Sequence, residues 1–200
     1  LPESRIPGRQ KIDLAALNPI RPLRWAFSAK GLMPIVVLFI TFSATGEAYS
    51  TCWALWGSDA FHWNGLWIGL SLGAFGVCQA LAQAFLPGPA VRRLGERATI
   101  LTGVAGACVG LVVMAFATEG WMIFAIMPVF VLGGIGAPAL QSLATRQVAE
   151  TQQGQFQGVL ASAVSLASIV SPLAFSSFYF VFRQEWPGAI WLSVVALYLV

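Results

Sequence analysis

The most constraining feature of this sequence is a series of long stretches that contain no Asp, Glu, Lys or Arg. They cover residues 31–46, 60–91, 98–118, 120–145 and 151–182. A membrane-spanning helix needs roughly 20 mostly apolar residues, because each residue adds about 1.5 Å and the hydrocarbon layer is about 30 Å thick. The hydrophobic share of 58% also exceeds what a soluble core can bury. We therefore predict an all-α integral membrane protein.

The charge-free stretches set the approximate bounds of the predicted helices. We expect membrane helices at about residues 32–56, 67–86, 99–117, 121–143, 157–182 and 188–200. The last run would span only about 20 Å as a helix, so we expect a six-helix bundle whose final helix is truncated. Residues 1–30, broken by prolines and charges, are interpreted as a cytoplasmic linker segment, and residues 31–200 as the transmembrane domain.

The basic residues predict which helix ends face the cytoplasm. Lysines and arginines gather before the first predicted helix, between the second and third, and after the fourth, whereas Arg183 alone lies at the opposite ends. Because cytoplasmic loops are enriched in Lys and Arg, we place the N-terminal end of the chain in the cytoplasm. Tryptophans typical of an aromatic belt lie at the other ends, among them Trp63, Trp121 and Trp186. The net charge of +3 thus reflects topology, and no nucleic-acid partner is expected.

The sequence contains no recognisable pattern of catalytic or metal-binding residues. Cys52, Cys78 and Cys108 lie in or beside predicted spans without metal-like spacing, so they are interpreted as packing residues. No nucleophile motif, metal cluster or phosphate-binding loop accompanies them. We predict that the chain is not an enzyme and that it has no cofactor and no metal site.

Glycines and prolines predict how the helices meet. Small residues at fourfold spacing favour close packing, and they occur in the second and third predicted helices at Gly65, Gly69, Gly73, Gly106 and Gly110. A second group predicts bends in the fourth and fifth helices, at Gly133, Gly134, Gly136, Pro138 and Pro172.

The segment Gly88–Arg97 carries the most distinctive motif. Its letters GPAVRRLGER fit the pattern G-x-x-x-x-R-x-G-x-R, and we expect a short cytoplasmic loop between the second and third helices. This pattern resembles the signature loop of the major facilitator superfamily. The resemblance implies a latch that loosens as a transporter changes state, in which arginines hold helix ends and nearby carboxylates. The candidate residues of this conformational loop are Gly88, Arg92, Arg93, Gly95 and Arg97. A purely topogenic basic loop is the alternative.

Motifs across nearly the whole chain are similar to those of the tetracycline/proton antiporters in that superfamily. They include residues 71–76, 81–84, 115–118, 133–136, 138–141 and 154–158. The resemblance implies that the predicted helices are helices 7 to 12 of a twelve-helix exporter in the bacterial inner membrane. It also implies exchange of a small-molecule drug, typically tetracycline bound to a divalent cation, for a proton. The partners would be the lipid bilayer and an N-terminal six-helix half. The alternatives are export of another amphipathic or cationic compound, and a non-transporting receptor or assembly half.

Three positions depart from the antiporter pattern. That group commonly has His at the position of Gln79, Asp at the position of Ala107 and Gln at the position of Glu47. Two titratable groups are therefore missing and one carboxylate is gained. These departures leave the substrate, the proton stoichiometry and the oligomeric state open.

Glu47 is the main candidate for proton coupling. A carboxylate inside a predicted span costs several kcal/mol to expose to lipid, so we expect it to face a cavity and to carry protons or bind a cationic drug. Contact with interfacial water is the alternative. The other candidate substrate-binding residues are Gln79, Gln83, Gln141 and Trp53, for which helix contacts and the aromatic belt are the alternatives.

Two further charged or titratable positions are given structural roles. Arg146 is expected to pair with Glu150, which lies one helical turn later. His62 is expected in the outer loop between the first and second helices.

Overall fold

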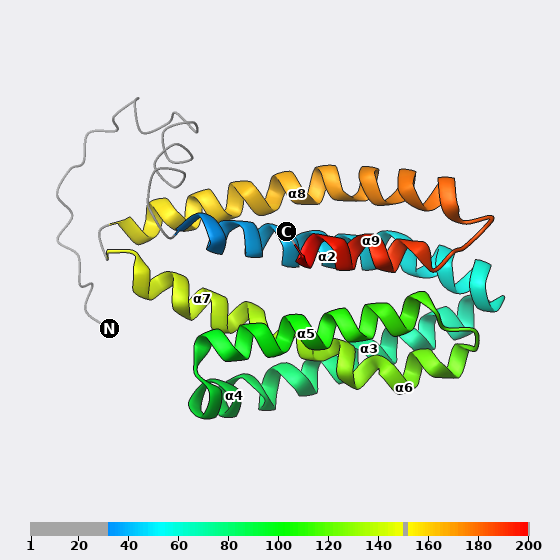
Figure 1. Ribbon diagram of the computed structural model, residues 1–200, viewed down its shortest axis with the longest axis horizontal. Helices are drawn as coiled ribbons and strands as arrows, with labels where there is room; N and C mark the ends of the chain where they lie inside the picture. The colour runs from blue at the N-terminus through cyan, green and yellow to red at the C-terminus, as the bar shows by residue number, and fades with distance from the viewer. Residues whose placement is uncertain (1–31, 150–151, 200) are drawn as a thin grey trace.

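The apolar stretches of the sequence form long helices. The computed structural model describes residues 32–149 and 152–199, which fold into a helical bundle (Figure 1). Its elements are α2 (Leu32–Phe61), α3 (Gly65–Phe85), α4 (Pro87–Leu94), α5 (Glu96–Ala115), α6 (Gly120–Phe130), η2 (Val131–Ile135), α7 (Gly136–Gln147), α8 (Gln153–Phe182) and α9 (Ala189–Tyr198). The predicted linker, residues 1–30, lies outside the described residues.

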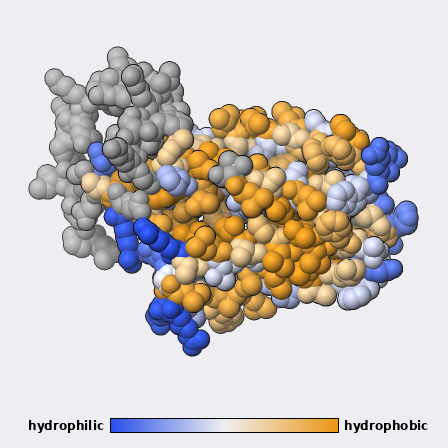
Figure 2. Space-filling view, viewed as in Figure 1, coloured by the Kyte–Doolittle hydropathy of each residue, from blue (hydrophilic) through white to orange (hydrophobic). Residues whose placement is uncertain are grey.

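The lengths and surface of these helices fit a lipid environment. Five spans are long and apolar enough to cross a membrane, namely α2, α3, α5, the stretch Gly120–Arg146 and α8, whereas α9 is apolar but shorter. Figure 2 shows apolar residues over most of one face of the molecule and hydrophilic residues gathered at its two ends. The chain is therefore a multi-pass helical membrane protein, as the sequence predicted.

The predicted loop over residues 88–97 is wrong for most of its length, because α4 occupies Pro87–Leu94. Pro87 starts this helix at a position where the missing N–H is not needed. Arg92 and Arg93 lie in its last turn, where their positive charges interact favourably with the helix dipole. Gly95 then separates α4 from α5. Its φ is 80°, a backbone conformation that glycine adopts more easily than other residues.

Several helix bounds differ from the sequence prediction. Helix α2 continues past residue 56 to Phe61, so Ser58 and Asp59 belong to its last turns and not to a loop. Asn64 starts α3, because its side-chain oxygen accepts a hydrogen bond of 3.1 Å from the backbone N–H of Trp67. Helix α8 begins at Gln153 and continues through Pro172 without a break.

The glycine-rich region of the fourth predicted helix is not α-helical throughout. Residues Val131–Ile135 form the 3-10 segment η2 between α6 and α7. Such a segment inside a span often marks a functional hinge. It packs closely against α5, since a Cβ atom built on Gly133 would lie 2.8 Å from the Cβ of Ala107. The predicted bend therefore corresponds to a change of helix type at a tight helix crossing.

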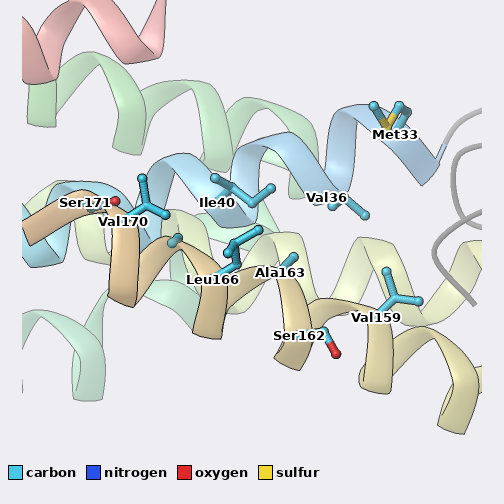
Figure 3. A pocket seen from close by; sticks show the side chains of 10 residues that line it. Met33, Val36, Ile40, Val159, Ser162, Ala163, Leu166, Val170 and Ser171 are labelled. Carbon is cyan, nitrogen blue, oxygen red and sulfur yellow. The ribbon is translucent and has the colours of Figure 1, made fainter. Parts of the chain in front are cut away.

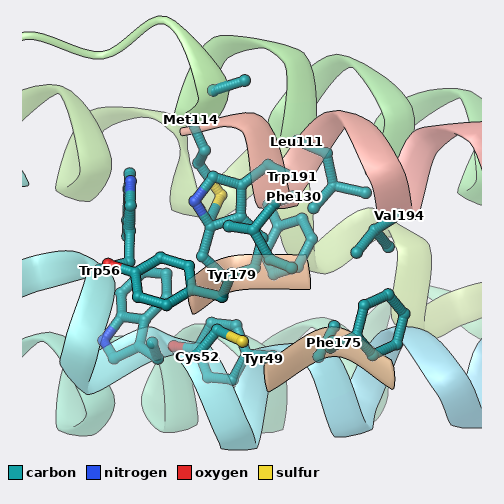
Figure 4. Packing of buried hydrophobic residues seen from close by; sticks show 14 of the residues in the cluster. Tyr49, Cys52, Trp56, Leu111, Met114, Phe130, Phe175, Tyr179, Trp191 and Val194 are labelled. Carbon is teal, nitrogen blue, oxygen red and sulfur yellow. The ribbon is translucent and has the colours of Figure 1, made fainter. Parts of the chain in front are cut away.

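Two clusters of buried side chains hold the bundle together. The first, here called the aromatic cluster, joins the C-terminal half of α2 to α5, α6, α8 and α9 and includes Tyr49, Trp53, Trp56, Tyr179 and Trp191. Figure 4 labels Tyr49, Trp56, Tyr179 and Trp191 in this cluster. Neighbouring rings stand 4.4–6.5 Å apart, distances at which aromatic pairs add about 0.5–1.5 kcal/mol each. The second is mainly aliphatic and joins the start of α2 to α7 and α8, with Leu32, Ile35, Leu140, Phe156 and Leu160.

Candidate functional site

One cavity of the bundle is almost entirely apolar. It has a volume of about 480 Å³ and lies between α2 and α8, with Met33, Ile40, Leu166 and Val170 among its lining (Figure 3). Ser162 also lines it, but its hydroxyl donates a hydrogen bond of 2.9 Å to the Gly158 carbonyl of its own helix. This cavity therefore offers few groups that would recognise a polar compound.

A second cavity combines aromatic rings with amides. It has a volume of about 370 Å³, and its lining comes from α2, α3, α5, α6, η2, α7 and α9: Phe42, Thr45, Gly46, Tyr49, Phe75, Gln79, Gln83, Ala107, Phe130, Gly133, Gly134, Ala137 and Tyr198. We call it the amide cavity. The structure thus brings together the predicted site residues Gln79 and Gln83, which lie one turn apart on α3.

Three aromatic rings form one wall of the amide cavity. The ring centroids of Tyr49 and Phe75 are 4.5 Å apart, and that of Phe130 lies 5.8 Å from Phe75 and 6.1 Å from Tyr49. Trp53 backs this wall with its centroid 4.4 Å from Tyr49. The sequence analysis did not select Tyr49, Phe75 or Phe130, because aromatic residues in apolar spans carry no signal that distinguishes a cavity wall from a core.

The position of the Gln79 side chain depends on the absence of a side chain at Gly134. A Cβ atom built on Gly134 would overlap the Gln79 amide nitrogen. Gly134 lies in η2, so the 3-10 segment and α3 approach each other closely enough to fix where this amide stands. The glycine-rich stretch therefore has a local role beyond the bend that the sequence predicted.

The remaining predicted site residues lie outside the amide cavity. Glu47 is half-buried on α2, and the Ser50 hydroxyl donates to its carboxylate over 3.5 Å. Trp53 is 2% exposed, and its indole N–H donates a hydrogen bond of 2.8 Å to Ser71. Gln141 is half-buried on α7 and is not among the cavity-lining residues. The roles given to these three residues from the sequence stay predictions.

Polar contacts also join the helices at one end of the bundle, where α2 and α8 end. Arg183 pairs with Asp59 over 2.8 Å, and the Tyr179 hydroxyl donates to the same carboxylate. This contact was not predicted from the sequence. A signal was available, because Asp59 and Arg183 carry opposite charges at helix ends that were predicted to lie on the same side of the membrane.

At the other end, Glu96 joins α5 to α7. Its carboxylate accepts a hydrogen bond of 2.7 Å from Ser142 and pairs with Arg146 over 3.4 Å. The expected partner of Arg146, Glu150, lies outside the described residues. The motif segment Gly88–Arg97 therefore contacts α7 through Glu96, a carboxylate that was not among the predicted residues.

The predicted loop arginines are placed differently. Arg92, Arg93 and Arg97 are exposed and form no ion pair with the residues that the structure describes. Gly88 is also exposed, within α4. Gly95 has the positive φ described above. Within residues 32–149 and 152–199, no group of three or more His, Cys, Asp or Glu side chains is placed to hold a metal ion.

The fold defines a multi-pass helical membrane protein, and the amide cavity lies between its helices with a mainly apolar lining that includes two amides. Residues 26–200 match the family model described as Major Facilitator Superfamily, and the chain belongs to that family.

Curated relatives give a more detailed comparison. The chain is 42% identical to "Tetracycline resistance protein, class C" of Escherichia coli, over 99% of this chain and 50% of that protein. It is 40% identical to "Tetracycline resistance protein, class G" of Vibrio anguillarum, over 92% of this chain and 47% of that protein. A more distant relative is "Hippocampus abundant transcript-like protein 1" of Homo sapiens, at 23% identity over 77% of this chain and 30% of that protein. The chain thus spans about half the length of the tetracycline resistance proteins that it matches.

Proposed function

We propose that this chain is the C-terminal six-helix half of a proton-coupled drug exporter in the bacterial inner membrane. The single observation that carries the proposal is the amide cavity, which places hydrogen-bonding amides and aromatic rings between membrane-spanning helices. Family membership and the tetracycline resistance relatives support a transporter over an enzyme. The alignment of 99% of the chain to 50% of a relative supports the assignment to one half.

The open surfaces of the bundle support an N-terminal half as the partner. Only 11% of the most apolar stretch of α3 and 28% of that of α8 are buried. In this family the site lies between two halves, so this chain would provide one wall. We expect the chain to export no drug when expressed without an N-terminal half. Active efflux by this chain alone, as a monomer, would contradict the two-half arrangement.

The proposed orientation places the N-terminal end of the chain in the cytoplasm. Ser58 lies near the end of α2 and Arg93 in α4, and both side chains are exposed. Single cysteines at these positions in an otherwise cysteine-free full-length protein should react with impermeant reagents from opposite faces, with Ser58→Cys accessible from outside. Labelling of both positions from one face would contradict the proposed topology.

The substrate class also belongs to the proposal. The amide cavity has Gln79 where the antiporters commonly have His and Ala107 where they commonly have Asp. These uncharged residues support a second candidate function beside tetracycline export, namely export of another amphipathic or cationic compound. Transport of tetracycline, with and without Mg²⁺, and of the cation ethidium by the full-length protein separates the two.

Glu47 is proposed as the coupling carboxylate. It follows Gly46, which lines the amide cavity, and it is half-buried within a membrane span. In everted vesicles that contain the full-length protein, Glu47→Gln should abolish drug-dependent proton movement while drug binding stays detectable, because the amide keeps the shape but does not titrate. Selective loss of cation binding, by roughly 1–3 kcal/mol, would instead make Glu47 a counter-charge for the drug.

The matched control is Glu119→Gln, which changes an exposed carboxylate at the start of α6. This control should keep both binding and coupling. If Glu47→Gln behaves like the control, Glu47 is not part of the site.

A further inference from the structure

Helix α4 lies at a membrane surface, because it connects two membrane spans. Helix α3 ends at Phe85 and α5 begins at Glu96, and both are long and apolar enough to cross a membrane. Figure 1 places α4 at the end of the bundle where α3 ends and α5 begins. With eight residues, α4 is too short to span the hydrocarbon layer itself. Its side chains therefore lie near the level of the lipid headgroups.

One side of α4 is seated on the bundle. Val91 is half-buried and packs against the second, mainly aliphatic cluster. Pro87 and Ala90 are half-buried as well, whereas Gly88 and Pro89 are exposed. These contacts hold the helix against the protein and leave its other side open.

Three arginines are exposed on α4 and at the start of α5, and we call them the arginine patch. Arg92 and Arg93 lie in the last turn of α4, and Arg97 in the first turn of α5. None of them forms an ion pair with a residue that the structure describes, and the neighbouring carboxylate of Glu96 is paired with Arg146. Figure 2 shows hydrophilic residues at this end of the molecule. Because a guanidinium binds a phosphate group through two parallel hydrogen bonds, the patch suits a phosphate-bearing ligand.

Exposed apolar side chains border the arginine patch. Phe85 at the end of α3 is 67% exposed, Leu86 is 38% exposed, and Leu94 at the end of α4 is 53% exposed. Apolar side chains beside basic ones are typical of segments at a membrane surface, where the former enter the acyl region and the latter meet anionic headgroups. A soluble phosphate compound would gain nothing from these three apolar side chains. The combination therefore favours a lipid.

We propose that the arginine patch binds the headgroup of an anionic phospholipid, such as phosphatidylglycerol, from the adjacent leaflet. The guanidinium groups bind the lipid phosphate, and the exposed apolar side chains contact the upper part of the acyl chains. This role differs from a latch, in which the same arginines would hold carboxylates of the protein. It requires neither the proposed export function nor the proposed orientation, because α4 lies at a membrane surface in either orientation.

Lipid binding to the full-length protein tests the assignment. The delipidated protein in detergent is titrated with phosphatidylglycerol or with phosphatidylcholine that has the same acyl chains, and native mass spectrometry gives an apparent Kd for the first bound lipid. The protein should bind phosphatidylglycerol about tenfold more tightly, because only this headgroup has a net negative charge. Equal affinity for the two lipids would overturn the proposal. Any cover that other parts of the full-length protein place over the patch is present in this assay.

Two triple variants locate the bound lipid. Replacing Arg92, Arg93 and Arg97 together by Gln should lower the preference for phosphatidylglycerol to about twofold or less, because the positive charges are lost. Replacing the same three residues by Lys should keep a preference of about fivefold or more, because the charges remain while the planar guanidinium groups are lost. An unchanged preference in the triple Gln variant would overturn the arginine patch as the lipid site.

The matched control removes one arginine at the opposite end of the bundle. Arg183→Gln takes away the positive charge that pairs with Asp59, whereas Arg93→Gln takes away one charge of the patch. Arg93→Gln should lower the preference about threefold, and Arg183→Gln should leave it unchanged. Equal losses in the two variants would show that net charge and not the patch attracts the lipid, which would overturn the proposal.

Two further measurements exclude the competing roles. The triple Gln variant should unfold at the same temperature as the unmodified protein in lipid-free detergent, because exposed arginines without ion pairs contribute little stability. A lower unfolding temperature together with an unchanged lipid preference would instead support a latch. Glycerol 3-phosphate at millimolar concentration should leave the bound phosphatidylglycerol in place, because it lacks acyl chains. Displacement of the lipid by this compound would assign the patch to a soluble phosphate ligand and overturn the proposal.

Discussion

Helices α3 and α5 carry the same pattern of glycines at fourfold spacing, yet only α5 uses it inside this bundle. Cβ atoms built on Gly106 and Gly110 would lie 3.0 Å and 2.7 Å from the Cβ atoms of Leu132 and Phe130. The same construction at Gly65, Gly69 and Gly73 meets nothing within 4 Å. Half of the most apolar stretch of α5 is buried, against 11% in α3. A glycine pattern therefore predicts that a helix face is able to pack closely, but not what it packs against.

The largest expected effect tests how tightly α5 is packed. Ala107→Asp places a carboxylate at a position that is 2% exposed and that directly faces Gly133. Overpacking and an unpaired buried charge should together destabilise the full-length protein by about 3–5 kcal/mol. Thermal unfolding in detergent measures this loss.

Ala107→Ser is the matched control for that change, because it adds one polar atom without a charge. It should cost much less than Ala107→Asp. A stable Ala107→Asp protein would mean that α5 and η2 separate easily, contrary to the close crossing described here.

A smaller effect is expected at the α5 glycines themselves. Gly110→Ala brings a methyl group against both the Cβ and the backbone Cα of Phe130, which lie 2.7 Å and 2.9 Å from the added atom. We expect a loss of about 1–3 kcal/mol in unfolding free energy, since the backbone has to move. Unchanged stability in the same unfolding assay would show that this face has room that the structure does not indicate.

The polar end of α5 should contribute still less. Glu96→Gln removes the ion pair with Arg146, whose side chain is 73% exposed, but keeps an oxygen that accepts from Ser142. Solvent screening limits the loss to about 0.5 kcal/mol. A loss above about 2 kcal/mol would show that this contact is a main tie of α5 to α7. Arg93→Gln, at an exposed position without an ion pair to the described residues, is the control.

The smallest effect is expected at the open glycine face of α3. Gly69→Ala meets no atom within 4 Å, and alanine favours a helix by up to about 1 kcal/mol. The bundle formed by this chain should therefore be unaffected or slightly stabilised. A loss of more than about 1 kcal/mol in the full-length protein would show that the α3 face packs against a helix outside the described residues. In that case the glycine faces of both α3 and α5 would be packed in the full-length protein.

Much of the fold was predictable because lipid imposes a simple rule on sequence. Charges are costly in the hydrocarbon layer, so the charge-free stretches between residues 31 and 182 mark the spans directly. Helix ends were less predictable. Phe61 extends α2 beyond the predicted end, and Pro87 starts a helix where glycines and arginines suggested a loop.

The candidate site was predictable only in part. Gln79 and Gln83 were selected because amides are uncommon in apolar spans, and both line the amide cavity. The aromatic residues of the cavity wall, Tyr49, Phe75 and Phe130, are indistinguishable in the sequence from other apolar residues of the spans. Trp53 was selected for its ring, but its packing against Tyr49 and its bond to Ser71 place it behind the cavity wall.

That this chain crosses the membrane several times follows from its amino-acid sequence alone, because that property depends on composition along single helices. The family also follows from the sequence, through motifs that are read locally. Which helix faces meet becomes visible only in the packed bundle: Gly134 makes room for Gln79, Glu96 and not an arginine of the motif joins α5 to α7, and α3 leaves its glycines open. The physical reason is that contacts between helices depend on rotation and spacing, which residues distant in the sequence fix together.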